Sequence, residues 1–213
     1  MSSSLSIALG CALASLAAGC SPVSEPARSP PGDPTPTPPP TRVTTFVPVV
    51  PPGSPREGSC WTLSIAAPRR AAWRCAMGNL IVDPCFAPPS TEGVVVCAAN
   101  PATGDPGFAL RLTKPLPGDV VTPSSTAEPW LLRLADGQVC TPFTGTVPEV
   151  GTEEARWSCA DASSPGSAGL VTTIDRGTTW TVQWYPAAEG HSPAHPSPPT
   201  VPARRIPVAD VWE

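Results

Sequence analysis

Residues 130–143 read WLLRLADGQVCTPF, and this stretch decides the fold class. Asp136-Gly137 lies between two apolar runs, and an Asp-Gly pair is among the strongest short-range signals for a β-hairpin. The reason is that Gly and Asp tolerate the positive φ angles of a tight two-residue turn. We therefore predict two antiparallel strands, one on each side of Asp136-Gly137.

Short apolar runs of the same kind flank this hairpin along the chain. Phe108, Leu110 and Leu112 alternate with other residues in GFALRLT, and Trp180, Val182 and Trp184 share one face of WTVQWY. Further strands are expected in CWTLSIA (60–66), LIVDPCF (80–86), GVVVCAA (93–99), RWSC (156–159), LVTTI (170–174) and, as a last edge strand, IPVADVW (206–212). About nine short strands at this spacing indicate a mainly β fold, a small β-sandwich or open barrel.

One segment follows a different pattern. In APRRAAWRCAMG (67–78), Pro68 stands where a first helical residue would, and Gly78 stands where a helix would end. Ala72, Cys75 and Ala76 share a face at helical spacing. The sequence therefore predicts one short helix here, in an otherwise β-rich domain.

The first twenty residues form a targeting segment. Leu5 to Ala18 is an apolar run of the length of a signal-peptide core, shorter than the roughly 18 residues that a membrane span needs. The run ends in LAAGC, which resembles the lipobox of bacterial lipoproteins, with Leu16 one place earlier than in that pattern. The resemblance implies cleavage after residue 19 and a diacylglycerol with palmitate-type acyl chains on Cys20, which would hold the protein in a lipid bilayer. Plain secretion after an Ala-x-Ala site such as Ala12 to Ala14 is the alternative.

Composition then divides the chain into three parts. Residues 1–19 are the expected signal peptide, residues 20–57 a disordered Pro-rich tether, and residues 58–213 a β-rich globular domain with a Pro-rich segment at 186–205. Proline removes amide donors and fixes φ, so the tether favours extended polyproline II. The single lysine, with many Arg, Ala and Pro, suggests a GC-rich, actinobacterial genome.

The chain holds eight cysteines. Cys11 would be removed and Cys20 would carry the lipid, so six are left, an even number that can pair in an oxidising compartment. Six cysteines allow about fifteen pairings. We prefer the nearest-neighbour set, Cys140–Cys159, Cys85–Cys97 and Cys60–Cys75.

The region from GSCWTLSIAAPRRAAWRC (58–75) through LADGQVC (134–140) to VADVWE (208–213) also resembles a recurrent domain of uncharacterised exported bacterial proteins. The resemblance implies a single extracytoplasmic domain behind a signal peptide and a Pro/Thr-rich tether. It implies no activity and no site residue.

Residues for catalysis are scarce. His191 and His195 both lie in the Pro-rich tail, and we expect no metal site and no cofactor. Ser64 and Lys114 are not spaced like a known Ser–Lys dyad. Glu153 and Glu154 are neighbours, which on a strand point to opposite faces and would not share a cleft. A net charge of −4 with no basic cluster argues against nucleic acid as a partner.

Seven tryptophans are the remaining feature. Most would fill a small β core, but exposed indoles bind sugars and peptides, so Trp61, Trp130, Trp180 and Trp184 are candidate ligand platforms. The sequence thus predicts a lipid-anchored protein on the extracytoplasmic face of the cell membrane. Its domain would bind a cell-wall component or an envelope protein without catalysis. The alternative is a secreted or anchored hydrolase of cell-wall glycan or peptide.

Overall fold

A computed structural model describes residues 37–118, 128–150, 153–160, 168–187 and 202–213. All described residues belong to one compact unit, residues 37–213. The expected signal peptide and Cys20 lie outside the described residues, as do His191 and His195. Within the described residues no helix is long and apolar enough to cross a membrane.

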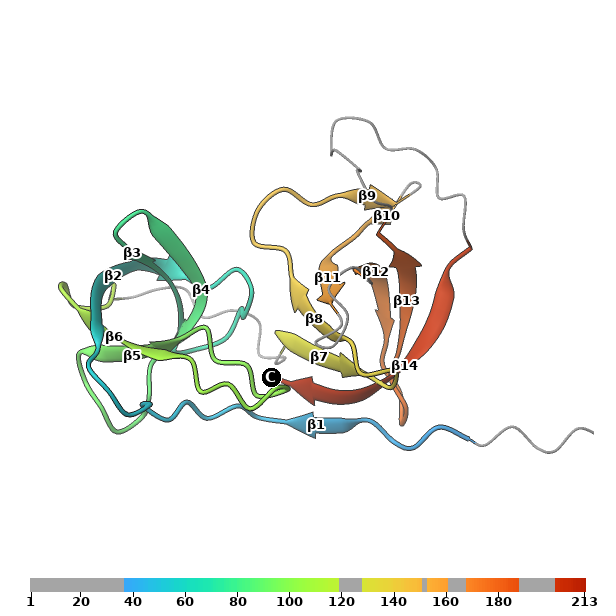
Figure 1. The fold of residues 1–213 in the computed structure, drawn as a ribbon, viewed down its shortest axis with the longest axis horizontal. Coiled ribbons are helices and arrows are strands. Elements are labelled where there is room, and N and C mark those ends of the chain that lie inside the picture. Colours follow the sequence, from blue (N-terminus) through green and yellow to red (C-terminus); the bar gives the residue numbers. More distant parts are fainter. Residues whose placement is uncertain (1–36, 119–127, 151–152, 161–167, 188–201) are drawn as a thin grey trace, which may run out of the picture. The chain divides into compact units, whose positions relative to one another are not determined.

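Five strands form the first closed barrel: β2 (Arg56–Leu63), β3 (Ala72–Met77), β4 (Leu80–Phe86), β5 (Val94–Cys97) and β6 (Phe108–Leu112). Each strand pairs antiparallel with the next along the chain. Because the number of strands is odd, the last strand returns in the direction of the first, and β6 closes the ring by pairing parallel with β2. Figure 1 shows the five strands wrapped into this ring.

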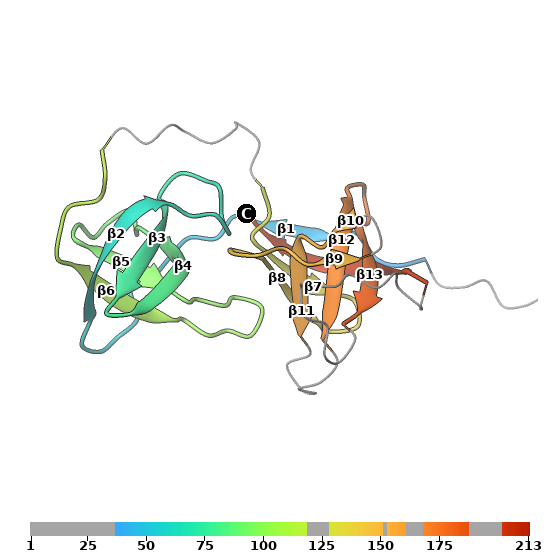
Figure 2. The same cartoon turned by 90° about the horizontal axis from the view of Figure 1, so that it is seen from above.

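Six strands close a second ring: β7 (Leu131–Leu134), β8 (Val139–Pro142), β11 (Trp157–Ala160), β12 (Gly169–Asp175), β13 (Thr181–Pro186) and β14 (Arg204–Trp212). All six pairings are antiparallel, as an even number requires, and the β14–β7 pairing closes the ring. Figure 2 labels these strands again except β14, together with β9 (Glu149–Val150) and β10 (Glu153–Glu154), which pair antiparallel as a separate two-stranded sheet.

The predicted Asp-Gly hairpin is confirmed as the β7–β8 turn. Gly137 has φ +91°, and its N–H donates to the Leu134 carbonyl at 3.0 Å. The Asp136 carboxylate accepts from the Gln138 backbone N–H at 3.3 Å and from its side-chain amide at 2.9 Å. Asp136 therefore stabilises the turn, which is the role that short polar side chains commonly have there.

Each ring encloses its own apolar core. The five-stranded barrel is filled from all of its strands, by Cys60, Trp73, Cys75, Cys85, Val95, Cys97 and Leu110 with Phe108 and Leu112 beside them. The six-stranded barrel is filled by residues that include Leu132, Trp157, Val171, Trp180, Val182, Trp184 and Val208. The alternation expected in GFALRLT and WTVQWY is thus confirmed, since the predicted inward residues belong to these cores.

A third apolar cluster combines residues of both barrels. Phe86 of β4 packs against Trp130, just before β7, with ring centroids 4.8 Å apart, and Phe46 contacts both rings. The guanidinium of Arg69 lies over Phe86 and donates to the backbone carbonyls of Phe46 and Glu213. Burial lowers the pKa of this guanidinium. Arg69 therefore joins the 64–71 loop of the first barrel to the chain end.

The mainly β, disulfide-stapled fold is confirmed, and its sheets are closed barrels. The predicted short helix is wrong: residues 72–77 form strand β3, and among the described residues there is no helix. Gly78, with φ +58°, lies in the β3–β4 turn, where it ends a strand. Pairing of β3 with both β2 and β4 satisfies the backbone on each side and overrides the local helix signals.

Two segments differ from the boundaries expected above. Residues 42–44, assigned to the tether, form β1 (Arg42–Thr44), which pairs parallel with β14. The expected edge strand at the C-terminus is instead β14, which pairs with β13 over residues 204–207 and with β7 over residues 208–212, while β1 pairs with residues 210–212. The last strand of the chain is therefore the one that closes the second barrel.

Candidate functional site

Three of the four candidate tryptophan platforms are buried. Trp130 belongs to the cluster shared by the two barrels, and Trp180 and Trp184 belong to the core of the second barrel. Trp61 is different, because 47% of its surface is exposed. The described residues include all seven tryptophans, and Trp61 is the single exposed one among them.

Trp61 faces solvent because it follows the inward-facing Cys60, and a β-bulge at Trp61 lets Leu63 face inward as well. Cys60 is opposite Cys75 and Thr62 is opposite Arg74, so Trp61 is the extra residue between two paired positions. Cys60 and Leu63 both pack inside the barrel, which leaves Trp61 on the outside. A bulge commonly redirects a side chain in this way. Simple alternation along CWTLSIA would place Trp61, Leu63 and Ile65 on one face, which is wrong here, since Trp61 and Ile65 are exposed while Leu63 packs against the core.

The neighbouring β3–β4 hairpin ends in exposed aliphatic residues. Leu80, paired with Met77, is 52% exposed, and Ile81, paired with Ala76, is 54% exposed. Ala76 is also paired with Ser59 of β2, so only small side chains lie between Ile81 and the β2 strand that carries Trp61. We call Trp61, Leu80 and Ile81 the apolar patch. The stretch from Cys75 to Val82 contains no charged residue, whereas Arg74, which is paired with Thr62 next to Trp61, is charged and lies 3.8 Å from the Asp83 carboxylate.

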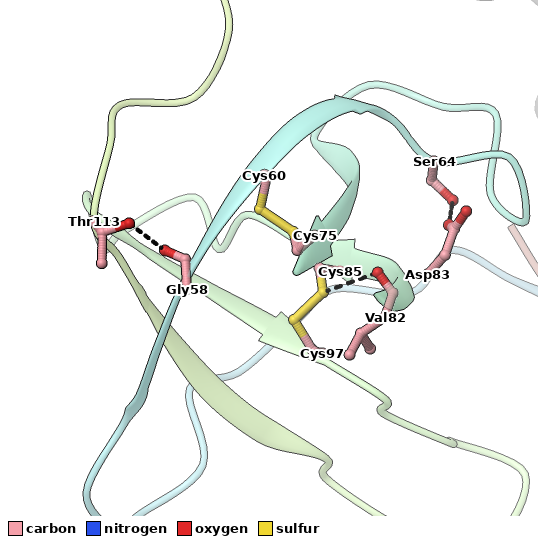
Figure 3. The surroundings of a disulfide bond; sticks show 9 residues. All are labelled: Gly58, Cys60, Ser64, Cys75, Val82, Asp83, Cys85, Cys97 and Thr113. Carbon is pink, nitrogen blue, oxygen red and sulfur yellow. Dashed lines mark hydrogen bonds between the residues drawn. A yellow bond between two sulfur atoms is a disulfide. The ribbon is translucent and has the colours of Figure 1, made fainter. Parts of the chain in front are cut away.

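Three disulfides join directly opposed residues of antiparallel strands: Cys60–Cys75, Cys85–Cys97 and Cys140–Cys159. These are the preferred nearest-neighbour pairs. Figure 3 shows the first two next to each other inside the five-stranded barrel. The sulfurs of Cys75, Cys85 and Cys97 lie within 4.8 Å of one another and are buried. Since all three are bonded in disulfides, they offer no thiolate to a metal ion.

Ser64 is a structural residue in this fold. Its hydroxyl donates to the Asp83 carboxylate and accepts the Ala67 N–H at 2.7 Å, and it is buried. The other Asp83 oxygen accepts the Ile65 N–H at 3.1 Å. Figure 3 shows the Ser64 and Asp83 side chains facing each other. This network holds the 64–67 loop in place. Lys114 is not part of the network and lines an open groove of about 550 Å³ with Glu92 and Leu116.

A second open groove, of about 520 Å³, lies along the second barrel and collects charged side chains. Glu153 and Glu154 both line it, so the expectation that they would not share a cleft is wrong. The reason is that β10 has only these two residues, and both are exposed. Glu128, also in the groove, is paired with Arg176.

No protein-family model, no curated protein and no solved structure matches the chain. The candidate site therefore rests on its own geometry: an uncharged patch on a barrel whose interior is already filled. Sequence reasoning selected Trp61 for its residue type. Leu80 and Ile81 were missed, although the uncharged hairpin MGNLI (77–81) carried a signal for them.

Proposed function

We propose that the protein is a membrane-anchored lipoprotein on the extracytoplasmic face of a bacterial cell. Its barrels would form a non-catalytic module that binds a component of the cell envelope through the apolar patch. The observation that carries this proposal is the exposure of Trp61, Leu80 and Ile81 on a barrel that already has a buried apolar core. Clustered exposed apolar side chains on a soluble domain commonly mark a contact surface.

The disulfides support the proposed extracytoplasmic location. All six cysteines between Cys60 and Cys159 are paired, and disulfides of this kind persist in oxidising, extracytoplasmic environments. The LAAGC motif supports the anchor at Cys20. A lipoprotein cysteine carries more than one acyl chain, which suffices for stable anchoring.

The anchor is tested by fractionation. The parent chain is expected in the membrane fraction, and Cys20→Ser is expected in the soluble or secreted fraction, because its acyl attachment is lost. Release of both chains into the soluble fraction would contradict the anchor.

The binding module is tested by retention of envelope components. Immobilised residues 21–213 are mixed with solubilised envelope proteins and with fragments of cell wall. Lipid vesicles are offered in a parallel experiment, and among proteins, wall fragments and vesicles we expect the parent to retain one component that Trp61→Ala does not retain. Equal retention by Trp61→Ala and the parent would show that the apolar patch is not the contact surface.

The hydrolase is the second candidate, and the groove that brings Glu128, Glu153 and Glu154 together is the observation in its favour. Glycoside hydrolysis needs a carboxyl group that stays protonated near neutral pH, which an apolar pocket provides. Glu153 and Glu154 are exposed and Glu128 is ion-paired, so the binding module is favoured. Release of wall fragments by the parent, and its loss in Glu153→Gln or Glu154→Gln, would reverse this order.

A further inference from the structure

We propose that the apolar patch inserts into the headgroup interface of a lipid bilayer, so that the first barrel lies against the membrane surface. This inference rests on the proposed function, because it takes the anchor at Cys20 as given. It identifies the envelope component at the patch as lipid and assigns the contact to Trp61, Leu80 and Ile81.

The chemistry of the patch fits this occupant. Tryptophan and long aliphatic residues are the side chains that enter the interface between lipid headgroups and acyl chains. Figure 1 shows the β3–β4 turn at one end of the barrel, and Leu80 is the first residue of β4. The turn residues Gly78 and Asn79 are exposed and uncharged, so entry of this hairpin would bury no charge.

The size of the patch argues against a stable protein partner. Three half-exposed side chains offer on the order of 300 Å² of apolar surface, whereas a stable interface needs roughly 800 Å² on each partner. A bilayer has no such threshold, since it accepts each apolar side chain separately. The small patch is therefore better suited to lipid than to a second copy of the chain or another protein.

Because the lipid anchor at Cys20 would already hold the protein at the membrane, a weak contact between the apolar patch and the bilayer is sufficient. Residues 20–36 can span at most about 60 Å when fully extended, so the described unit cannot leave the membrane surface by more than this reach. Tethering raises the effective concentration of the patch at the bilayer, and avidity then exceeds what either contact gives alone. The chain is acidic overall, so the contact would depend on apolar insertion with little help from anionic lipid.

The test uses residues 21–213, which contain the whole compact unit with its barrels and disulfides but lack the apolar leader and Cys20. Binding to phosphatidylcholine vesicles is measured by co-sedimentation at low and high salt. The parent is expected to bind weakly, with the same affinity at both salt concentrations. Brominated phosphatidylcholine should quench part of the tryptophan emission, and this quenching should be lost in Trp61→Ala.

Two sets of variants make the test specific. Leu80→Ser and Ile81→Ser are each expected to weaken vesicle binding by about fivefold, because each removes a half-exposed aliphatic side chain from the interface. Val47→Ser with Val49→Ser is the matched control, since Val47 and Val49 are 59% and 76% exposed but lie outside the patch. This control should bind like the parent.

Absence of vesicle binding by the parent would overturn the inference, and so would equal losses in the patch and control variants. Retention of an envelope protein through Trp61, without vesicle binding, would overturn the lipid occupant and leave the proposed function standing. If the parent neither bound vesicles nor retained an envelope component, both the lipid contact and the proposed binding module would be overturned.

Discussion

Arg133 on β7 donates to the buried carboxylate of Asp210 on β14, with its Nε 2.7 Å from Oδ2. The two residues are direct partners in the register that closes the six-stranded barrel. On the other side of β14, Arg42 of β1 pairs with the second oxygen of Asp210. The Asp210 carboxylate therefore links β14 to β7 on one side and to β1 on the other.

Removing this carboxylate should weaken the closure. We expect Asp210→Ala to lower the free energy of unfolding by about 2 kcal/mol, because it breaks a buried ion pair while both arginines regain some hydration. Urea denaturation measures the change. Asp175→Ala is the matched control: its pair with Arg205 is exposed on both sides, so a change below about 0.5 kcal/mol is expected. Equal changes in the free energy of unfolding of the two variants would show that the buried Asp210 contacts stabilise the protein no more than the exposed pair does.

Gly169 on β12 leaves no room for a side chain. A Cβ there would lie 1.8 Å from Nε1 of Trp184, which donates to the Gln138 side chain at 3.1 Å inside the barrel. Gly169→Ala should therefore destabilise the protein by about 3 kcal/mol, as overpacking of a tight core does. Gly177→Ala is the control, since the nearest atom to its Cβ is 3.7 Å away. Thermal unfolding followed by near-UV circular dichroism, which reports on Trp184, would compare the two.

Arg69 should matter for the packing at the chain end. Arg69→Ala removes the donors to the Phe46 and Glu213 carbonyls, and we expect a loss of about 2 kcal/mol together with faster hydrogen exchange at Phe46. The guanidinium stays charged at ordinary pH although burial lowers its pKa, so this contribution should not change between mildly acidic and neutral pH. Arg205→Ala, at an exposed ion pair, should change neither readout.

The disulfides should account for much of the stability of both barrels. Cys140 and Cys159 are separated by 19 positions, and a cross-link of this span contributes about 3 kcal/mol. The double variant Cys140→Ser with Cys159→Ser should lose this amount in urea denaturation while the first barrel keeps its two disulfides. An unchanged midpoint in the double variant would contradict this contribution.

Local signals predicted part of this fold well. The Asp136-Gly137 turn and the nearest-neighbour cysteine pairs depend on residues close in sequence, and the structure has both. The alternation in residues 180–184 identified the core face of β13 for the same reason. Closure of the barrels could not be predicted in this way, because the β14–β7 and β6–β2 pairings join segments far apart in the chain.

The candidate site was harder to predict for a physical reason. A β-bulge at Trp61 places Trp61 and Leu63 on opposite faces of β2, and a one-residue insertion of this kind leaves no mark in the hydrophobic pattern. Residues 72–77 show the opposite problem: Pro68 and Gly78 imitate helix boundaries around a strand that tertiary pairing fixes. Trp61 was thus selected for its residue type, while its exposure became clear only from the fold.

The non-reduced intact mass of the protein from its native membrane fraction tests the lipid anchor most directly. We predict a chain that starts at Cys20, is heavier by a diacylglycerol and a further acyl chain, and is lighter by the six hydrogens of three disulfides. A soluble chain without added lipid and with a free thiol at Cys20 would contradict the anchor, and with it the membrane contact inferred for Trp61.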